Sequence, residues 1–215
     1  MSDQKSRLKP PDPADTEPSR RRILDAALEE FAEHGLAGGR VDRIAERASV
    51  NKAMIYYHFN SKENLYRETI ADIYRRALDE IKNRASVQSS FDDLLRDASR
   101  IYFKIAGNHA ALPRILLREL AEPESEILTM ISSIIRESGA PQKLLERFQE
   151  KMRDGTIRTL DVRHTLASFL ALNIGSILMA PMITKVLQIP DTETFLQERQ
   201  EAVVDVFLHG VKVTR

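Results

Sequence analysis

The chain has 215 residues, of which 42% are apolar and 30% are charged, so it is long and apolar enough to bury a core. Its 32 basic and 32 acidic residues balance, so any nucleic-acid surface must come from local clustering of cations. The chain has no cysteine, which excludes disulfides, thiolate metal sites and cysteine nucleophiles. Eight glycines and the lack of alternating β-branched runs predict an all-α fold.

The first eighteen residues hold four of the nine prolines together with mixed charge, which predicts a disordered tail over 1–18. They contain no apolar stretch, so we expect no secretory signal. Apolar residues at helical spacing then predict a first helix from Ser19 to Gly35, where glycine is a natural stop. Three arginines, at 20, 21 and 22, open this helix against its dipole. An anionic partner and simple solvation explain these arginines equally well.

The next three helices carry the main functional signal. Apolar spacing predicts helices over 41–48 and 53–59, separated by a short turn, and Ser61 is suited to cap a long helix over 61–83. In a helix-turn-helix the second helix enters the major groove of DNA while the first crosses the backbone. The segment 40–62 holds five basic residues against two acidic ones. This local excess of cations favours an anionic partner.

The expected recognition helix carries aromatic rings at four successive positions, which point four ways on a helix. Ile55 and Phe59, four residues apart, can both face a core. Tyr56, Tyr57 and His58 are then left at or near solvent. Phenol hydroxyls beside neighbouring lysines suit a phosphate backbone, whereas half-buried packing is the alternative for the two tyrosines.

The rest of the chain is predicted to form six more amphipathic helices, which gives nine or ten helices in total and no strands. Ser90 and Asp93 suit the capped start of the first of them. These helices are expected over about 91–105, 110–121, 124–137, 141–153, 162–188 and 192–210.

Residues 165–184 form a run of twenty without a formal charge, which is the length that spans a bilayer. Five polar side chains and Pro181 interrupt the run, so we predict a helix buried on most of its circumference and no association with a membrane. Small residues such as Ala171 and Gly175 would let another helix approach closely. An uncharged helix near the end of a small chain therefore indicates an oligomer interface.

The stretch from Ala48 to Leu65, with its IYYHF and SKE sequences, resembles the DNA-binding motif of the TetR (tetracycline repressor) family. The match extends back over ILDAALEEFAEHG and VDRIAERA and covers about residues 20–67. The resemblance implies a helix-turn-helix DNA-binding domain over 19–67, followed by a ligand-binding and dimerisation domain over 68–215. It also implies a cytoplasmic homodimeric repressor that binds a palindromic operator and is released by a small molecule.

The resemblance assigns roles to single residues. Tyr56 and Lys62 would contact phosphates, and the residues that would face the groove are Lys52, Ala53, Met54, Tyr57 and His58. The sequence departs from the family pattern at three places. Ser49 and Asn51 replace the usual Gly and Ser of the turn, and Met54 replaces a hydroxyl residue. Gly39 and Arg40 stand where Thr or Ser usually caps the second helix, so Arg40 is expected to take over the phosphate contact but not the cap.

The family's dimer form implies an interface built from 162–188 and 192–210. The effector pocket is expected among the helices between 91 and 180, and an apolar or amphipathic effector fits their methionines. Simple packing is an equal alternative for each candidate lining residue. The candidates are Tyr102, Phe103, Met130, Phe148, Met152, Phe169 and Asn173, with Arg118 and Glu119 as a source of charge selection.

No catalytic constellation is present in the sequence. The five histidines are scattered, without metal-ligand spacing, and no glycine-rich phosphate loop exists. Pairs such as Glu29 and Glu30 are interpreted as solvated. We therefore expect no enzyme, no metal and no cofactor. The remaining alternative is a helical ligand carrier or interaction module that has lost DNA binding.

Overall fold

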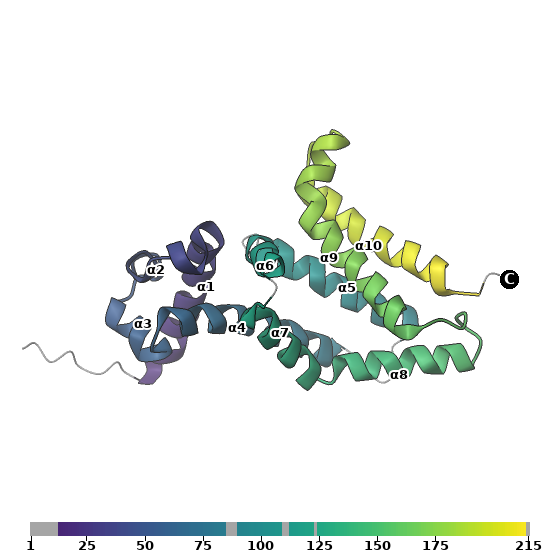
Figure 1. The fold of residues 1–215 in the computed structure, drawn as a ribbon, viewed down its shortest axis with the longest axis horizontal. Helices are drawn as coiled ribbons and strands as arrows, with labels where there is room; N and C mark the ends of the chain where they lie inside the picture. Colours follow the sequence, from purple (N-terminus) through teal and green to yellow (C-terminus); the bar gives the residue numbers. More distant parts are fainter. Residues whose placement is uncertain (1–12, 85–89, 109–111, 123, 214–215) are drawn as a thin grey trace, which may run out of the picture. The chain divides into compact units, whose positions relative to one another are not determined.

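The computed structural model describes residues 13–84, 90–108, 112–122 and 124–213 (Figure 1). Across these ranges the secondary structure consists of ten helices and one isolated β-bridge, between Ile157 and Lys212. The predicted all-α class with nine or ten helices is confirmed. The helices are α1 (Pro13–Gly38), α2 (Val41–Ala48), α3 (Lys52–Phe59), α4 (Lys62–Arg84), α5 (Phe91–Asn108), α6 (Leu112–Ala121), α7 (Glu126–Glu137), α8 (Ala140–Arg153), α9 (Val162–Val186) and α10 (Thr192–Val211).

The predicted tail over 1–18 is wrong in its last part, because α1 begins at Pro13; residues 1–12 lie outside the described residues. Ser19, which follows this stretch, is buried, and its hydroxyl lies 3.2 Å from the ring of His58 in α3. The predicted stop at Gly35 is a kink with φ 69°, after which helical backbone continues to Gly38. Glycine adopts this left-handed φ without a Cβ penalty.

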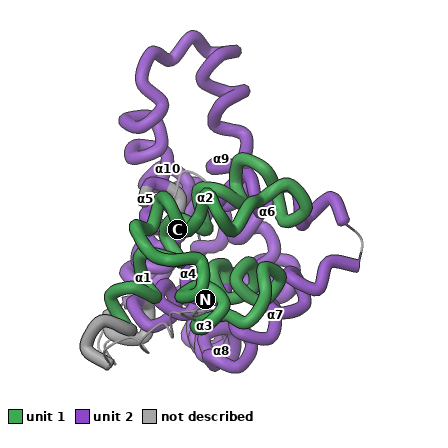
Figure 2. Tube along the Cα trace, turned by 90° about the vertical axis from the view of Figure 1, so that its left-hand side faces the viewer, with its two compact units in different colours: residues 1–70 green, residues 71–215 purple. Residues whose placement is uncertain are grey.

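The chain divides into two compact units, residues 1–70 and residues 71–215 (Figure 2). We call the first the head and the second the body. The described part of the head holds α1, α2, α3 and the first turns of α4. Its core is apolar and fully enclosed, with Phe31 packed edge-on against Tyr66 at 5.0 Å between ring centroids. The core residues below 2% exposure include Ile23, Phe31, Ile44, Ile55, Phe59 and Leu65.

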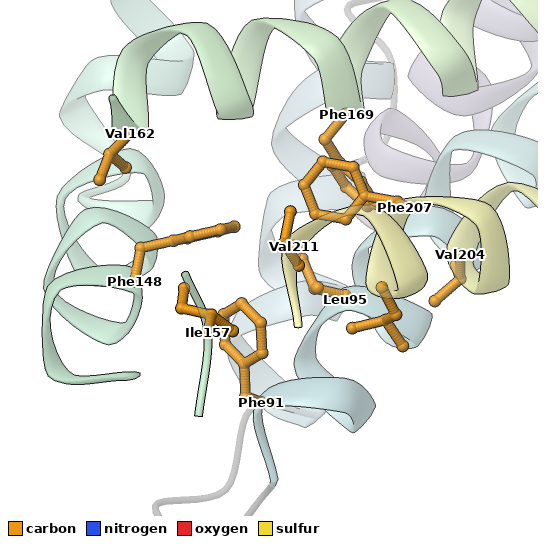
Figure 3. Packing of buried hydrophobic residues seen from close by; sticks show 10 residues of the cluster. Phe91, Leu95, Phe148, Ile157, Val162, Phe169, Val204, Phe207 and Val211 are labelled. Carbon is orange, nitrogen blue, oxygen red and sulfur yellow. The ribbon is translucent and has the colours of Figure 1, made fainter. Parts of the chain in front are cut away.

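The body is built around an aromatic cluster that joins α5, α8, α9 and α10 (Figure 3). Phe91 meets Phe148 edge-on at 4.8 Å, and Phe169 meets Phe207 at 4.9 Å. Edge-to-face pairs of this kind add about 0.5–1.5 kcal/mol each beyond the burial of their area. These contacts join residues that are far apart in the chain and therefore fix how the four helices pack.

The uncharged helix α9 is less buried within the chain than predicted. It is long and apolar enough to cross a membrane by length and composition, yet only 22% of its most apolar 18-residue stretch is buried. The expectation of a helix buried on most of its circumference is therefore wrong for a single chain. The reason is that its contacts with α5, α6, α8 and α10 leave Met179, Met182 and Val186 exposed.

Candidate nucleic-acid interface

The turn between α2 and α3 is held by local polar contacts. Ser49 ends α2 in the left-handed conformation with φ 53°, and the N–H of Val50 donates to the carbonyl of Ala45 at 3.0 Å. Asn51 caps α3, because its side-chain oxygen accepts the N–H of Ala53 at 2.9 Å. Serine and asparagine thus supply the geometry of a short turn in place of the usual glycine and serine.

The helix α3 presents one buried and one exposed face. Ile55 and Phe59 are fully buried in the head, as their spacing predicts. Tyr56 and Tyr57 are exposed, with 43% and 62% of their area accessible. Lys52 and Ala53 are also exposed, and Met54 is half-buried. An uninterrupted strip of side chains therefore runs from the first turn of α3 to the two phenols.

His58 differs from the other predicted groove residues. It is half-buried, and its Nε2 lies 3.2 Å from the hydroxyl of Ser19 in α1. Burial lowers the pKa of His58, and the neighbouring Arg20 guanidinium lowers it further against the opposing effect of Glu17. This contact ties α3 to α1 and leaves the ring of His58 half-exposed.

Lys62, at the start of α4, is held beside the end of α1. Its ammonium donates to the carbonyls of Ala37 and Gly39, each at 3.3 Å. An ammonium has three donors, so one N–H remains for an outside acceptor. Ser61 caps the same helix end, because its hydroxyl accepts the N–H of Asn64 at 3.0 Å. The head thus fixes the position of this cation before any partner binds.

Arg40 begins α2 without a side-chain cap, as the sequence predicts, and its side chain is exposed. A carboxylate from α1 satisfies one backbone N–H at the start of α2, because Glu30 Oε1 accepts the N–H of Arg40 at 3.0 Å. The preceding residue, Gly39, has no room for a side chain. A Cβ there would lie 2.7 Å from the ring of Phe31, which explains why no Thr or Ser stands at that position.

Sequence reasoning missed Glu30, which is wholly buried and not solvated as predicted. Glu30, Glu33 and His34 lie close enough together to share a metal ion. However, Arg43 Nη1 lies 3.7 Å from Glu30, and Arg47 Nη2 lies 3.2 Å from Glu33. Arg43 also donates to His34 Nε2 at 3.1 Å, because a guanidinium has no acceptor. We interpret the group as a charge-balanced link between α1 and α2. Helical spacing was the signal that could have found it, because Glu30 lies seven residues after Ile23 and three after Ala27, on the buried face of α1.

The three arginines near the start of α1 do not open the helix, because α1 begins at Pro13. Each has a partner within the head. Arg20 pairs with Glu68 at 3.1 Å and lies over the ring of Phe59 at 5.4 Å. Arg21 pairs with Asp25, and Arg22 donates to the carbonyl of Ala48 at the end of α2. Contacts inside the head therefore account for these charges.

An exposed ion pair joins the first turns of α2 and α3. The ammonium of Lys52 lies 2.7 Å from a carboxylate oxygen of Asp42. The hydrogen bond from Lys52 lowers the pKa of Asp42, and the same bond raises the pKa of Lys52. Both groups stay charged at neutral pH, so a cation and an anion stand side by side at the tip of the recognition helix.

The predicted effector residues have different surroundings in the body. Phe148 and Phe169 belong to the aromatic cluster, with Tyr102 and Met152 packed against it. Asn173 is fully buried, where its amide oxygen accepts the hydroxyl of Ser99 at 2.6 Å. Phe103 is buried and Met130 half-buried, and both lie outside the cluster.

Burial raises the pKa values of the Tyr74 and Tyr102 phenols, and the neighbouring Tyr102 raises the pKa of Tyr74 further. Two open hollows on the described surface lie elsewhere, near the turn between α6 and α7. They measure about 570 and 510 Å³ and are lined by Glu119, Glu122, Ser125 and residues of α7. Of the predicted effector residues only Glu119 lines one of them.

The match to a family model covers residues 23–69 and carries the description "Bacterial regulatory proteins, tetR family". The transcriptional repressor SCO4008 of Streptomyces coelicolor is 48% identical over 52 residues, which cover 24% of this chain and only 27% of that protein. The fatty acid metabolism regulator protein of Bacillus subtilis is 30% identical over 151 residues, which cover 68% of this chain and 75% of that protein. These two relatives are thus similar over different lengths.

Among solved structures, FadR of Bacillus subtilis in complex with stearoyl-CoA matches with a TM-score of 0.64 at 22% identity. The alignment covers 86% of this chain and 97% of that chain. At this identity the likeness concerns the fold. It extends through both units, whereas the match to the family model lies wholly within the head.

Proposed function

Because this chain belongs to the tetR family of bacterial regulatory proteins, we propose that it is a transcriptional repressor that binds a palindromic operator as a homodimer. It is a regulator of transcription and not an enzyme. The observation that carries the proposal is the exposed face of α3, which presents Lys52 and two phenols, while the ammonium of Lys62 is held at the start of α4. We infer that it acts in the cytoplasm, where DNA is available.

The DNA contacts divide into two kinds. Tyr56, Lys62 and Arg40 contact phosphates and set the register of the head on the duplex. Lys52, Ala53, Met54 and Tyr57 face the base edges in the major groove, and His58 supports them from behind. A single short recognition helix reads only a few base pairs. Two heads about one helical turn apart, or slightly more, supply the remaining affinity and specificity.

The second copy of the chain binds along α9 and α10, within 162–188 and 192–210. The supporting observation is the exposure of apolar side chains on both helices, with Val186 of α9 at 72% and Val206 of α10 at 61% exposure. Gly175 lies on α9 with open space where a Cβ would stand, so another helix can approach it. An interface between two copies would remove this face from water, and insertion into a membrane would do the same. The charged helices around it favour the protein partner.

The effector is an amphipathic molecule, and we propose a long-chain acyl thioester of coenzyme A. FadR of Bacillus subtilis binds stearoyl-CoA in its solved structure, and the fatty acid metabolism regulator of the same organism is the 30% identical relative. In this chain the acyl part would enter among Tyr102, Phe148 and Phe169, with the buried Asn173 as a polar anchor. Opening that cluster is the conformational change. A difference of about 3 kcal/mol between the two states of the body releases an operator roughly a hundredfold.

Fluorescence anisotropy with labelled duplexes that tile the DNA around its own gene tests the proposal. We expect saturable binding of one duplex and release on addition of stearoyl-CoA, but not on addition of coenzyme A or stearate alone. Binding of stearoyl-CoA without binding of any duplex would instead identify a ligand carrier. If the protein binds an operator and no acyl thioester changes that binding, the proposed repressor function stands and the proposed effector is wrong.

A further inference from the structure

The exposed pair of Asp42 and Lys52 is the feature of the head that the proposed contacts do not explain. Lys52 occupies the first position of α3, which is the end of a recognition helix that comes closest to base edges. Asp42 comes from the first turn of α2, with 63% of its side chain exposed. An exposed carboxylate at that tip is repelled by the phosphates on either side of the groove. It needs a compensating contact if the head is to bind DNA well.

The distance between the two groups matches one feature of a base pair. Lys52 Nζ and Asp42 Oδ1 are 2.7 Å apart, so a donor and an acceptor stand next to each other. In a G·C pair the guanine O6 acceptor and the cytosine N4 donor are hydrogen-bonded to each other, and are therefore about 2.7–3.2 Å apart. The ammonium can donate to O6 while the carboxylate accepts from N4. Each charged group then finds its complement on one base pair.

The order of the two groups gives the pair a direction. With the lysine over the purine and the aspartate over the pyrimidine, the ammonium also reaches guanine N7, which is a second acceptor. In a C·G pair or an A·T pair at the same place, the ammonium of Lys52 would meet an amino group of the base. The carboxylate of Asp42 would meet a carbonyl oxygen, so neither group could form a hydrogen bond. A T·A pair keeps one acceptor and one donor in order but offers a methyl group in place of N7. The expected preference is G·C first and T·A second.

Resting on the proposed function, we propose that Asp42 and Lys52 act together as one reading unit for a single G·C base pair in each operator half-site. Asp42 is thus a specificity-determining residue of α2, although it is acidic and lies outside the recognition helix. The ion pair holds both side chains in place before binding. Less side-chain freedom is then lost when the groove is entered.

The test uses the full chain and a library of duplexes with a randomised core. Bound duplexes are selected and sequenced for the wild type, for Asp42→Ala and for Glu46→Ala. Glu46 is an exposed carboxylate on the same helix, so its removal changes the charge of the head equally. We expect the wild type and Glu46→Ala to select G·C at one half-site position, and Asp42→Ala to lose roughly tenfold of that preference.

An exchange variant gives the sharper result. Asp42→Lys combined with Lys52→Asp keeps the ion pair and reverses its order, so it should select C·G at the same position. If Asp42→Ala instead tightens binding to all duplexes equally and leaves every base preference unchanged, the carboxylate is only an electrostatic penalty and the inference is wrong. If the wild type enriches no sequence at all, the proposed repressor function fails, and the inference fails with it.

Discussion

The head and the body both expose large aromatic or aliphatic side chains, but the charges of the residues around them differ. In the head, Tyr56 and Tyr57 are exposed on the same helix as Lys52, whose ammonium is paired with Asp42. In the body, Met179, Met182 and Val186 stand on a helix whose twenty central residues carry no charge. A phenol beside an ammonium suits a hydrated anion such as DNA, whereas an uncharged aliphatic face suits another apolar face. The same kind of exposure therefore indicates two different partners.

The largest expected effect comes from a charge placed on the apolar face of the body. Gly175→Glu should give monomers and weaken operator binding by about a hundredfold or more, because an unpaired buried carboxylate costs several kcal/mol and one head alone reads too little DNA. Sedimentation and anisotropy measure the two effects. Gly107→Glu is the matched control, since that α5 glycine also has open space around it. A dimeric Gly175→Glu protein would move the interface elsewhere.

The next effect tests what holds the head together. Glu30→Ala should lower the free energy of unfolding by about 1–3 kcal/mol, because it leaves the N–H of Arg40 without its acceptor and Arg43 without a neighbouring carboxylate. Chemical denaturation measures this change. Glu29→Ala, which removes an exposed neighbour, should change the same free energy by less than about 0.5 kcal/mol. Equal losses in the two variants would contradict the role of the buried cluster.

A smaller effect sharpens the assignment of the head to an anionic partner. Lys62→Ala should weaken binding to every duplex and reduce the slope of log affinity against log salt by about one, as for a single lost phosphate contact. Tyr56→Phe should weaken binding in the same uniform way but more mildly. Anisotropy titrations at several salt concentrations give the slope. An unchanged slope with weaker binding would mean that Lys62 only supports the carbonyls of Ala37 and Gly39.

Relief of backbone strain in the turn should have an effect of about 1 kcal/mol. Ser49 adopts a positive φ, so Ser49→Gly should stabilise the head by about that amount. Ser132→Gly, at an exposed position inside α7, should destabilise the body by a similar amount. Thermal melting of the two variants should therefore shift in opposite directions. Melting shifts of the same sign would show that strain at Ser49 is not relieved.

The smallest effect concerns pH. Because the pKa of His58 is lowered in the folded head, the unfolded chain binds more protons near the ordinary histidine value of 6.5. This contribution to stability is therefore full above that value and is lost as the pH falls through the lower folded value. Melting temperatures from about pH 8 to about pH 5 should fall less steeply for His58→Gln than for the wild type. Parallel curves would show that His58 contributes nothing to this pH dependence.

The sequence by itself determined the helices and the chemistry of the turn. Helical periodicity and capping residues are local properties, so α2, α3 and the cap of α4 by Ser61 follow from residues only a few positions apart. The inward direction of Ile55 and Phe59 follows from the same spacing. The same spacing predicts that Tyr56 and Tyr57 are exposed, and they are. The resemblance to a known family then supplied roles that no periodicity contains.

Only the tertiary structure decided which side chains far apart in the chain meet. Glu30 was interpreted as solvated like its neighbour Glu29, and the contact between His58 and Ser19 of α1 was not foreseen. The pair of Asp42 and Lys52 joins two helices, and the aromatic cluster joins four. Burial and charge pairing depend on what packs opposite a residue. The pattern of apolar and polar residues along the sequence specifies which face of a helix is buried, but not which other helix packs against that face.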